Sequence, residues 1–287
     1  MKRPLKTTHR ATAVMGAAVP ATTMTSRKRH DTLAKFERLG AAALETLLNA
    51  IDANDPVTGA HVRRVARYSL VLADAMGCDE HEASLVERVA LFHDIGKIHE
   101  ALFDVIHDHN KLDRHERREI RTHPERGAKV LEPLAAFYPD LPKGVVAHHE
   151  RWDGSGYPRG LRQKAIPLSS RIVAIADTFD AITHSRRYRP GRSVTVAMEV
   201  IGDGRGTQFD PDLVDLFLSP PVIAAVRAEM RAASTVERTP ERRRRTPRGE
   251  RVDAPDVSFR WRETAPRQQG AAVETKRSPA RKAKTRR

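Results

Sequence analysis

The chain has 287 residues, which is long enough for one large or two small domains with a sizeable core. Its formal net charge of +14 comes from its ends, since residues 1–30 carry seven Lys or Arg and no acid, and residues 231–287 carry 18 basic against seven acidic groups. A single cysteine, Cys78, excludes an intrachain disulfide and a cysteine-based zinc cage, and no run of about 18 apolar residues indicates a membrane span.

The composition predicts one folded domain over residues 32–232, between disordered basic tails over residues 1–31 and 233–287. The C-terminal tail has the run ERRRRTPRGER, scattered Pro and Ser, and too few large apolar residues to offset the entropy of ordering. Because the body between the tails is mildly acidic, the pI of 10.4 is no evidence that the body binds nucleic acid. The tails are expected either to contact a polyanion such as RNA, DNA or anionic lipid, or to act only as solubilising segments.

Helical periodicity begins near the N-terminal end of this body. Residues 33–52 predict a first helix. From Val62 to Met76 the apolar residues fall on one helical face, and Gly77 follows where a left-handed terminal residue is favourable. The N-terminal segment ATAVMGAAVPA is too weakly hydrophobic for a secretory signal, so a cytoplasmic location is expected.

Further helices follow in chain order. Apolar spacing from Leu85 to Ile95 predicts a helix that ends at Gly96, and His123-Pro124 predicts a helix start. Residues 172–182 predict another helix, and Asp210-Pro211 combines an N-cap acid with a proline at the first helical position. Since no alternating run long enough for a sheet is present, we expect an all-α bundle of about seven helices.

Five of the 13 histidines are candidates for metal ligands because each adjoins a helix signal and an apolar stripe, whereas the others are more simply read as solvated surface groups. The candidates are His61, His93, His123, His148 and His149. Helical bundles build metal sites from such side chains on facing helices. Asp94, next to His93, has two oxygens with which to bridge a pair of cations.

Two acids lie in the helical stripe RIVAIADTFDAIT. Asp177 is in the middle of the stripe, where burial of a carboxylate is costly unless a cation pairs with it. Asp180, one turn later, could take the same role by its spacing, or it could be a surface or capping acid.

The order of these residues resembles a known family. HDIGK at His93–Lys97, a His-Pro, HHERWDGSGYPRGL at His148–Leu161, and DTFDAITHSRRYR are similar to the HD-GYP subgroup of the HD superfamily of metal-dependent phosphohydrolases. HDIGK alone is moderately specific, whereas the longer motif is highly specific. The resemblance covers about residues 45–220.

The resemblance implies an all-helical domain that hydrolyses cyclic di-GMP to pGpG or GMP through a metal-bridging hydroxide. It implies iron or manganese, one ion held by His61, His93, Asp94 and Asp177, and a second held by Asp94, His123, His148 and His149. Lys97 would face the scissile phosphate, and Arg186 and Arg189 would meet phosphate or guanine. Gly156, Tyr157 and Pro158 match the name-giving tripeptide, whose loop is expected to help form the site and to contact partners, such as a GGDEF-type or other signalling protein.

The sequence departs from the family pattern at several positions. Members with a third metal have Glu four residues before the first histidine, where this chain has Val57, so two metals are expected. The usual Gly-Ile-Pro after HDIGK is replaced by IHEALFDVIHDHN, and Arg187 stands where proline is usual. The residues before Asp31 are too few for a receiver, PAS or GGDEF-like region, so regulation by a standard fused sensor is not expected.

Three other functions are also compatible with the sequence. The domain could hydrolyse another nucleotide within the same metal cage. It could be a catalytically silent cyclic di-GMP signalling scaffold that works through the GYP loop or the tails. Lastly, the basic tails could dominate function by binding polyanions, which salt-dependent affinity would test.

Overall fold

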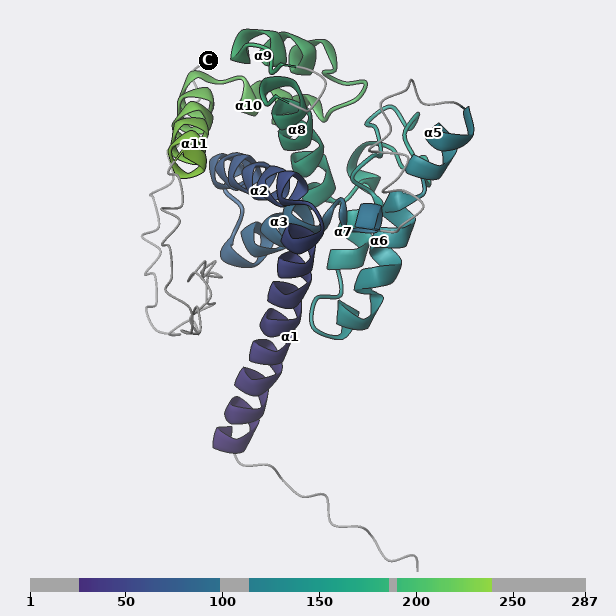
Figure 1. The fold of residues 1–287 in the computed structure, drawn as a ribbon, viewed down its shortest axis with the longest axis vertical. Coiled ribbons are helices and arrows are strands. Elements are labelled where there is room, and N and C mark those ends of the chain that lie inside the picture. Colours follow the sequence, from purple (N-terminus) through teal and green to yellow (C-terminus); the bar gives the residue numbers. More distant parts are fainter. Residues whose placement is uncertain (1–25, 99–113, 186–189, 239–287) are drawn as a thin grey trace, which may run out of the picture.

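The computed structural model describes residues 26–98, 114–185 and 190–238 (Figure 1). Its α-helices are α1 (Ser26–Asn54), α2 (Pro56–Met76), α3 (Glu80–Phe92), α5 (Arg114–Ile120), α6 (His123–Leu131), α7 (Leu141–Val146), α8 (Leu168–Thr183), α9 (Val194–Asp203), α10 (Pro211–Phe217) and α11 (Pro220–Arg238). Short 3-10 segments are η1 (Ile95–Ile98), η2 (Glu132–Ala136) and η3 (Gln163–Ala165). The described residues form no strand, so the expected all-α class is confirmed, and seven of their α-helices have nine residues or more.

The boundaries of α2 follow from its sequence. The Asp55 carboxylate accepts the N–H groups of Val57 and Thr58, and Pro56 occupies the first helical position. At the other end, Gly77 has φ 79°, a left-handed conformation that a side chain disfavours. The C-terminal end of α2 therefore lies where the sequence predicted it, whereas the helix begins at Pro56, six residues before Val62, from which the apolar periodicity predicted it.

The predicted end of α3 at Gly96 is wrong. The helix ends at Phe92, and Gly96 lies within η1. A Cβ on Gly96 would lie 2.1 Å from the carbonyl oxygen of His123 and 2.6 Å from the nitrogen of Gly127. Gly96 is therefore needed because η1 touches the backbone of α6, and this contact between distant segments is not visible in local sequence.

The core is built where α2, α3 and α8 pack together. Figure 1 shows α5, α6 and α7 on one side of this centre and α9, α10 and α11 on the other. Tyr68 of α2 and Phe179 of α8 are fully buried, with rings edge to face at 5.3 Å between centroids. These contacts fix α2 against α8, and both helices carry candidate ligands.

The two ends of the described bundle extend past the predicted domain limits. Helix α1 begins at Ser26 and α11 ends at Arg238, while the rest of the predicted tails lies outside the described residues. The second half of α1 packs on the bundle through buried Leu44, Leu48 and Ile51, Phe36 stacks on Phe137 at 4.2 Å between ring centroids, and the beginning of the helix projects away (Figure 1). Within the described residues, every helix is too short or too polar to cross a lipid bilayer.

Candidate metal centre

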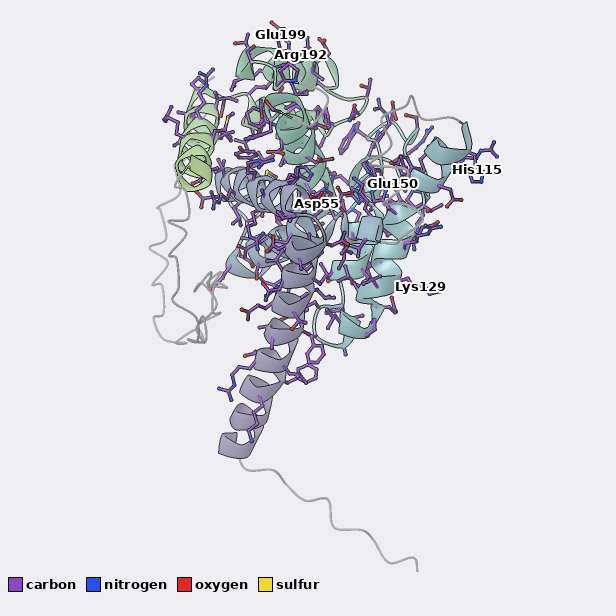
Figure 2. All side chains as sticks on the ribbon, in the orientation of Figure 1. Asp55, His115, Lys129, Glu150, Arg192 and Glu199 are labelled. Atoms are coloured by element: carbon purple, nitrogen blue, oxygen red, sulfur yellow. The ribbon has the colours of Figure 1, made fainter. Side chains whose placement is uncertain are left out.

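Seven predicted ligands from five helices lie around one point. His61 is on α2, Asp177 is on α8, His93 and Asp94 directly follow α3, His123 begins α6, and His148 and His149 follow α7. The Nε2 atom of His61 lies 3.3 Å from an Asp177 oxygen, and the Nε2 atom of His123 lies 3.1 Å from that of His148. His115, by contrast, points away from the bundle (Figure 2).

Asp94 lies between two groups of donor atoms. Its Oδ2 atom is 3.5 Å from His93 Nε2 and 3.9 Å from His61 Nε2. Its Oδ1 atom is 3.2 Å from His123 Nε2 and 4.0 Å from His148 Nε2. One carboxylate oxygen therefore faces each group, which is the arrangement of a bridging ligand.

Backbone hydrogen bonds fix the ring orientation of three of the histidines. In each, Nδ1 donates to a carbonyl three residues earlier, at 2.6–2.7 Å, and that carbonyl belongs to the end of a helix. The pairs are His93 with Ala90, His123 with Ile120, and His148 with Val145. A neutral ring has one N–H, so Nε2 of each ring presents a lone pair to the centre.

The arrangement of these lone pairs is suited to binding cations. His123 Nε2 and His148 Nε2 face each other at 3.1 Å with neither ring having a proton to share. His93 Nε2 and Asp94 Oδ1 are buried without a hydrogen-bond partner. Buried acceptors without partners are costly, and divalent cations would satisfy all four atoms. The donor atoms of His61, His93 and Asp94, and those of His123, His148 and His149, lie within 4.8 Å of one another in each group.

The electrostatics of the centre favour neutral imidazoles at His93, His148 and His149. Burial lowers the pKa of His93, of His148 and, to about 3, of His149. Burial alone would raise the pKa of Asp94, but the charges of Lys97 and His93 outweigh it and hold that pKa well below its usual range. The acid and these rings are thus in the protonation states that metal ligands need.

His61 differs from the other ligands. Burial lowers its pKa, but hydrogen bonds to Asp177 and Asp180 outweigh burial and raise it to about 9. Its Nδ1 lies 2.7 Å from Asp180 Oδ2, and the side chain of Asp180 is 2 % exposed. Asp180 is therefore neither a surface acid nor a helix cap. It is a buried partner of a candidate ligand, and the sequence offered only its one-turn spacing from Asp177 as a signal.

Of the predicted phosphate-binding residues, the structure places Lys97 beside the cluster. Its Nζ atom lies 2.5 Å from Asp94 Oδ2, and its side chain is 30 % exposed. Arg186 and Arg189 lie outside the described residues. Val57 stands where family members with a third metal have glutamate. It is 55 % exposed, and its hydrocarbon side chain has no atom that can bind a metal.

The GYP loop, which carries Gly156, Tyr157 and Pro158, forms one wall of the centre. The ring of Tyr157 stacks on His149 at 4.9 Å between centroids, and the Arg121 guanidinium lies 4.4 Å from the centroid of the same tyrosine ring. A Cβ on Gly156 would lie 2.3 Å from the backbone nitrogen of Arg151, so the loop can close only with glycine there. Pro158 follows Tyr157 and is half-buried.

Glu150 shapes this loop, and it was not among the residues predicted from the sequence. The Glu150 carboxylate accepts the N–H groups of Arg159 at 2.7 Å and Leu161 at 3.0 Å. It is 4 % exposed. Its place directly after the two histidines was the only sequence signal that could have indicated this role.

Residues 45–213 match the HD domain family. The chain belongs to this family. Its HD domain begins within α1 and ends within α10, and the match confirms the family that HDIGK indicated.

Curated relatives of this HD domain are cyclic dinucleotide phosphodiesterases, in keeping with the HD-GYP resemblance. One is the 3'3'-cGAMP-specific phosphodiesterase 2 of Vibrio cholerae, 40% identical over 60% of this chain and 33% of the relative. Another is the cyclic di-GMP phosphodiesterase response regulator RpfG of Xanthomonas campestris, 37% identical over 61% of this chain and 46% of the relative. The chain thus spans less than half the length of these two relatives.

Among solved structures, this HD domain is similar to a cyclic GMP-AMP-specific phosphodiesterase of V. cholerae, V-cGAP3. The TM-score is 0.47 and the identity 22%, over 71% of this chain and 53% of that one.

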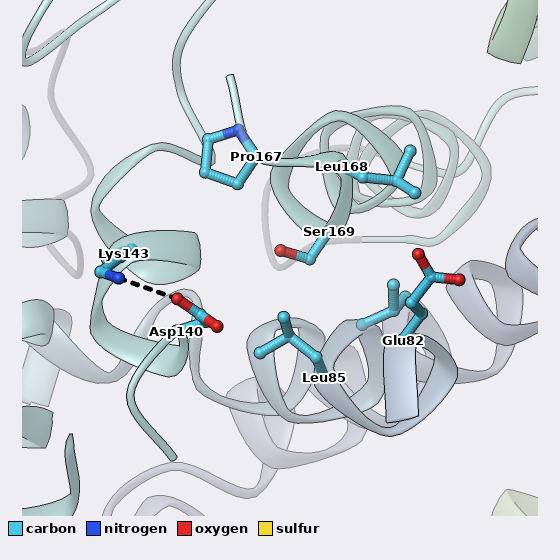
Figure 3. A pocket seen from close by; sticks show the side chains of 8 residues that line it. Glu82, Leu85, Asp140, Lys143, Pro167, Leu168 and Ser169 are labelled. Carbon is cyan, nitrogen blue, oxygen red and sulfur yellow. Dashed lines mark hydrogen bonds and ion pairs between the residues drawn. The ribbon is translucent and has the colours of Figure 1, made fainter. Parts of the chain in front are cut away.

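A separate cavity of about 180 Å³ lies between the starts of α3, α7 and α8 in this HD domain (Figure 3). Its walls include Leu85, Leu168 and Ser169, with the Lys143–Asp140 ion pair at one side. None of the seven candidate ligands lines it. The cavity is therefore separate from the candidate metal centre.

Proposed function

We propose that this HD domain is a metal-dependent phosphodiesterase that hydrolyses cyclic di-GMP to pGpG or GMP. The observation that carries the proposal is Asp94, whose two oxygens face two separate groups of imidazole lone pairs. The names of the curated relatives support the reaction class.

The proposed centre holds two ions. His61, His93, Asp94 and Asp177 would hold one, and Asp94, His123, His148 and His149 the other. Imidazole and carboxylate donors suit iron or manganese, which are the metals we propose. Such cations would supply Lewis acidity that lowers the pKa of water and neutralises phosphate charge.

In this proposal, Lys97 would move from its carboxylate partner to the phosphate of the substrate. Its ammonium pairs with Asp94 Oδ2, the oxygen that faces His61 and His93. Cations at this carboxylate would compete with Lys97 for the same oxygen. The half-exposed ammonium would then be free to meet a phosphate oxygen and stabilise its added charge, as phosphoryl transfer requires.

A second candidate substrate is 3'3'-cGAMP. The support is specific, because the 40% identical relative of V. cholerae is named for that substrate. Both dinucleotides present the same phosphodiester to the centre, so discrimination would depend on base contacts beside Tyr157 and Arg121.

The deciding experiment is anaerobic purification and metal quantification, followed by incubation with cyclic di-GMP, 3'3'-cGAMP and a panel of linear nucleotides. We expect two iron or manganese ions per chain and hydrolysis of a cyclic dinucleotide. Metal binding without turnover of any of these would favour the silent-scaffold alternative.

Replacing Asp94 tests the centre directly. Asp94→Ala removes an oxygen from both ions, so metal content and turnover should both fall to background. Asp140→Ala, which replaces an exposed acid directly before α7, should change neither. Full activity in Asp94→Ala would contradict the proposed mechanism.

The partner assignments belong to the same proposal. A signalling protein, such as a GGDEF-type protein, would bind at the GYP loop, and the basic segments 1–31 and 233–287 would contact polyanions. A cytoplasmic location accords with a nucleotide substrate.

A further inference from the structure

A polar network lies behind His61, on the side away from the centre. Asp180 Oδ2 is 2.7 Å from His61 Nδ1, while Arg64 donates from Nε to Oδ1 at 2.8 Å and from Nη2 to Oδ2 at 3.1 Å. His184, the C-cap of α8, places its Nδ1 atom 2.9 Å from Asp180 Oδ1. Both oxygens of one buried carboxylate are therefore engaged by side chains of α2 and by the end of α8.

His61 needs such a partner because of its position in the fold. The other bonded rings use carbonyls in the last turn before a helix end, which lack a helical N–H partner. His61 lies inside α2, where the preceding carbonyls accept helical hydrogen bonds. An acceptor for its Nδ1 must come from another helix, and Asp180 of α8 supplies it across 119 residues of sequence.

We infer that Asp180 is a positioning residue for the metal held by His61. By accepting the Nδ1 proton it leaves Nε2 as the donor atom and aims that atom between Asp177 and Asp94, at 3.3 Å and 3.9 Å. Arg64 and His184 hold the carboxylate in place. This inference rests on the proposed function, since it assigns a role within the same centre.

The chain offers a matched control for the loss of a buried acid. Asp210 is 3 % exposed and accepts from Arg171 at 2.5 Å, so it is a buried carboxylate in an arginine pair like Asp180. Asp210 caps α10, and its two oxygens accept from Arg171 and from the N–H of Asp212 and not from a candidate ligand. A general cost of removing a buried charge should therefore appear in both variants, whereas a positioning effect should appear only at Asp180.

The test measures Mn²⁺ affinity on the full chain by equilibrium titration with detection of free Mn²⁺ by electron paramagnetic resonance. His61→Ala should remove one binding step and His123→Ala the other, and this comparison assigns each step to one of the two ion sites. Asp180→Ala should weaken the step that His61→Ala removes by about 10- to 100-fold and leave the other within about twofold. Asp180→Asn, whose carbonyl oxygen can still accept from Nδ1, should recover part of the loss, and Asp210→Asn should leave both steps unchanged.

A second readout keeps the inference falsifiable if Asp180→Ala folds poorly. In metal-free protein with ¹⁵N-labelled histidine, the proton on His61 Nδ1 should resonate downfield because Asp180 accepts it, and Asp180→Asn should move that resonance upfield. Unchanged Mn²⁺ affinity in Asp180→Ala and Asp180→Asn would overturn the inference. Equal weakening of both steps, with the same loss in Asp210→Asn, would also overturn it by indicating a purely structural role.

The two proposals fail in different ways. Wild-type protein that binds two Mn²⁺ but hydrolyses no cyclic dinucleotide would refute the proposed function alone, because the affinity comparison uses no turnover. Wild-type protein that binds no metal would overturn both proposals.

Discussion

His61 is held between carboxylates on both sides of its ring, and its protonation should therefore govern metal loading. With its pKa raised to about 9, the metal-free protein carries the imidazolium at neutral pH. A metal needs the neutral ring, so binding must displace one proton from His61. The buried rings of His93, His148 and His149, whose pKa values are lowered, have no such proton to lose.

This predicts a pH dependence with a definite sign. Below pH 9, each unit of acidification should weaken the His61 site by about tenfold, since one proton competes with the metal. Calorimetric titration with Mn²⁺ in two buffers of different ionisation enthalpy should find about one proton released per chain at pH 7.5. Affinity that stays constant between pH 7 and 9 would contradict the protonation assigned to His61.

At the scale of elements, the GYP loop is shaped by a single buried carboxylate and by its anchors. Besides the Glu150 bonds, the N–H groups of Trp152 and Asp153 donate to carbonyls of Gln208 and Thr207, in the segment between α9 and α10. The loop that stacks Tyr157 on His149 is thus tied to the far end of the bundle as well as to α7.

Glu150→Ala should loosen this loop without removing a ligand. It leaves the N–H groups of Arg159 and Leu161 unpaired, at a cost of about 1–3 kcal/mol each if they stay buried. We expect a lower melting temperature, and in hydrogen exchange a loss of protection at these two amides. Glu132→Ala, at an exposed position after α6, is the control, and equal protection in both variants would argue against a role for Glu150.

Across the bundle as a whole, the candidate metal centre links the central helices α2, α3 and α8 to α6 and α7 on one side. Ligands come from α2 and α8 in the centre and from the starts or ends of α3, α6 and α7. Cations that bind only the folded state should therefore stabilise the entire domain, by about 2.7 kcal/mol at a free concentration one hundred times the dissociation constant.

Metal removal tests that coupling. Chelation should lower the melting temperature measured by calorimetry, and added Mn²⁺ should restore it. Asp94→Ala, which lacks the bridging oxygens, should not respond to the chelator. If the wild type does not respond either, the metals do not hold the helices together.

The sequence predicted those parts of this molecule that depend on local physics. Gly77 marks the end of α2, and the histidines beside helix signals are the ones that gather in space. It failed where one segment meets a distant one. Gly96 was read as a helix end although it serves a contact with α6, and Asp180 was left open because its partner is 119 residues away.

Most of the ligands lie at junctions, where a helix has just ended or is about to begin. Each helix advances about 100° per residue, so inserting one residue into the short connection before His123, or between α7 and His148, would turn a donor atom out of the centre. Substitutions along the outer faces of α6 and α9 leave those joints untouched. Re-engineering of this scaffold can therefore change the outer faces of α6 and α9, but it must preserve the number of residues in each connection that carries a ligand.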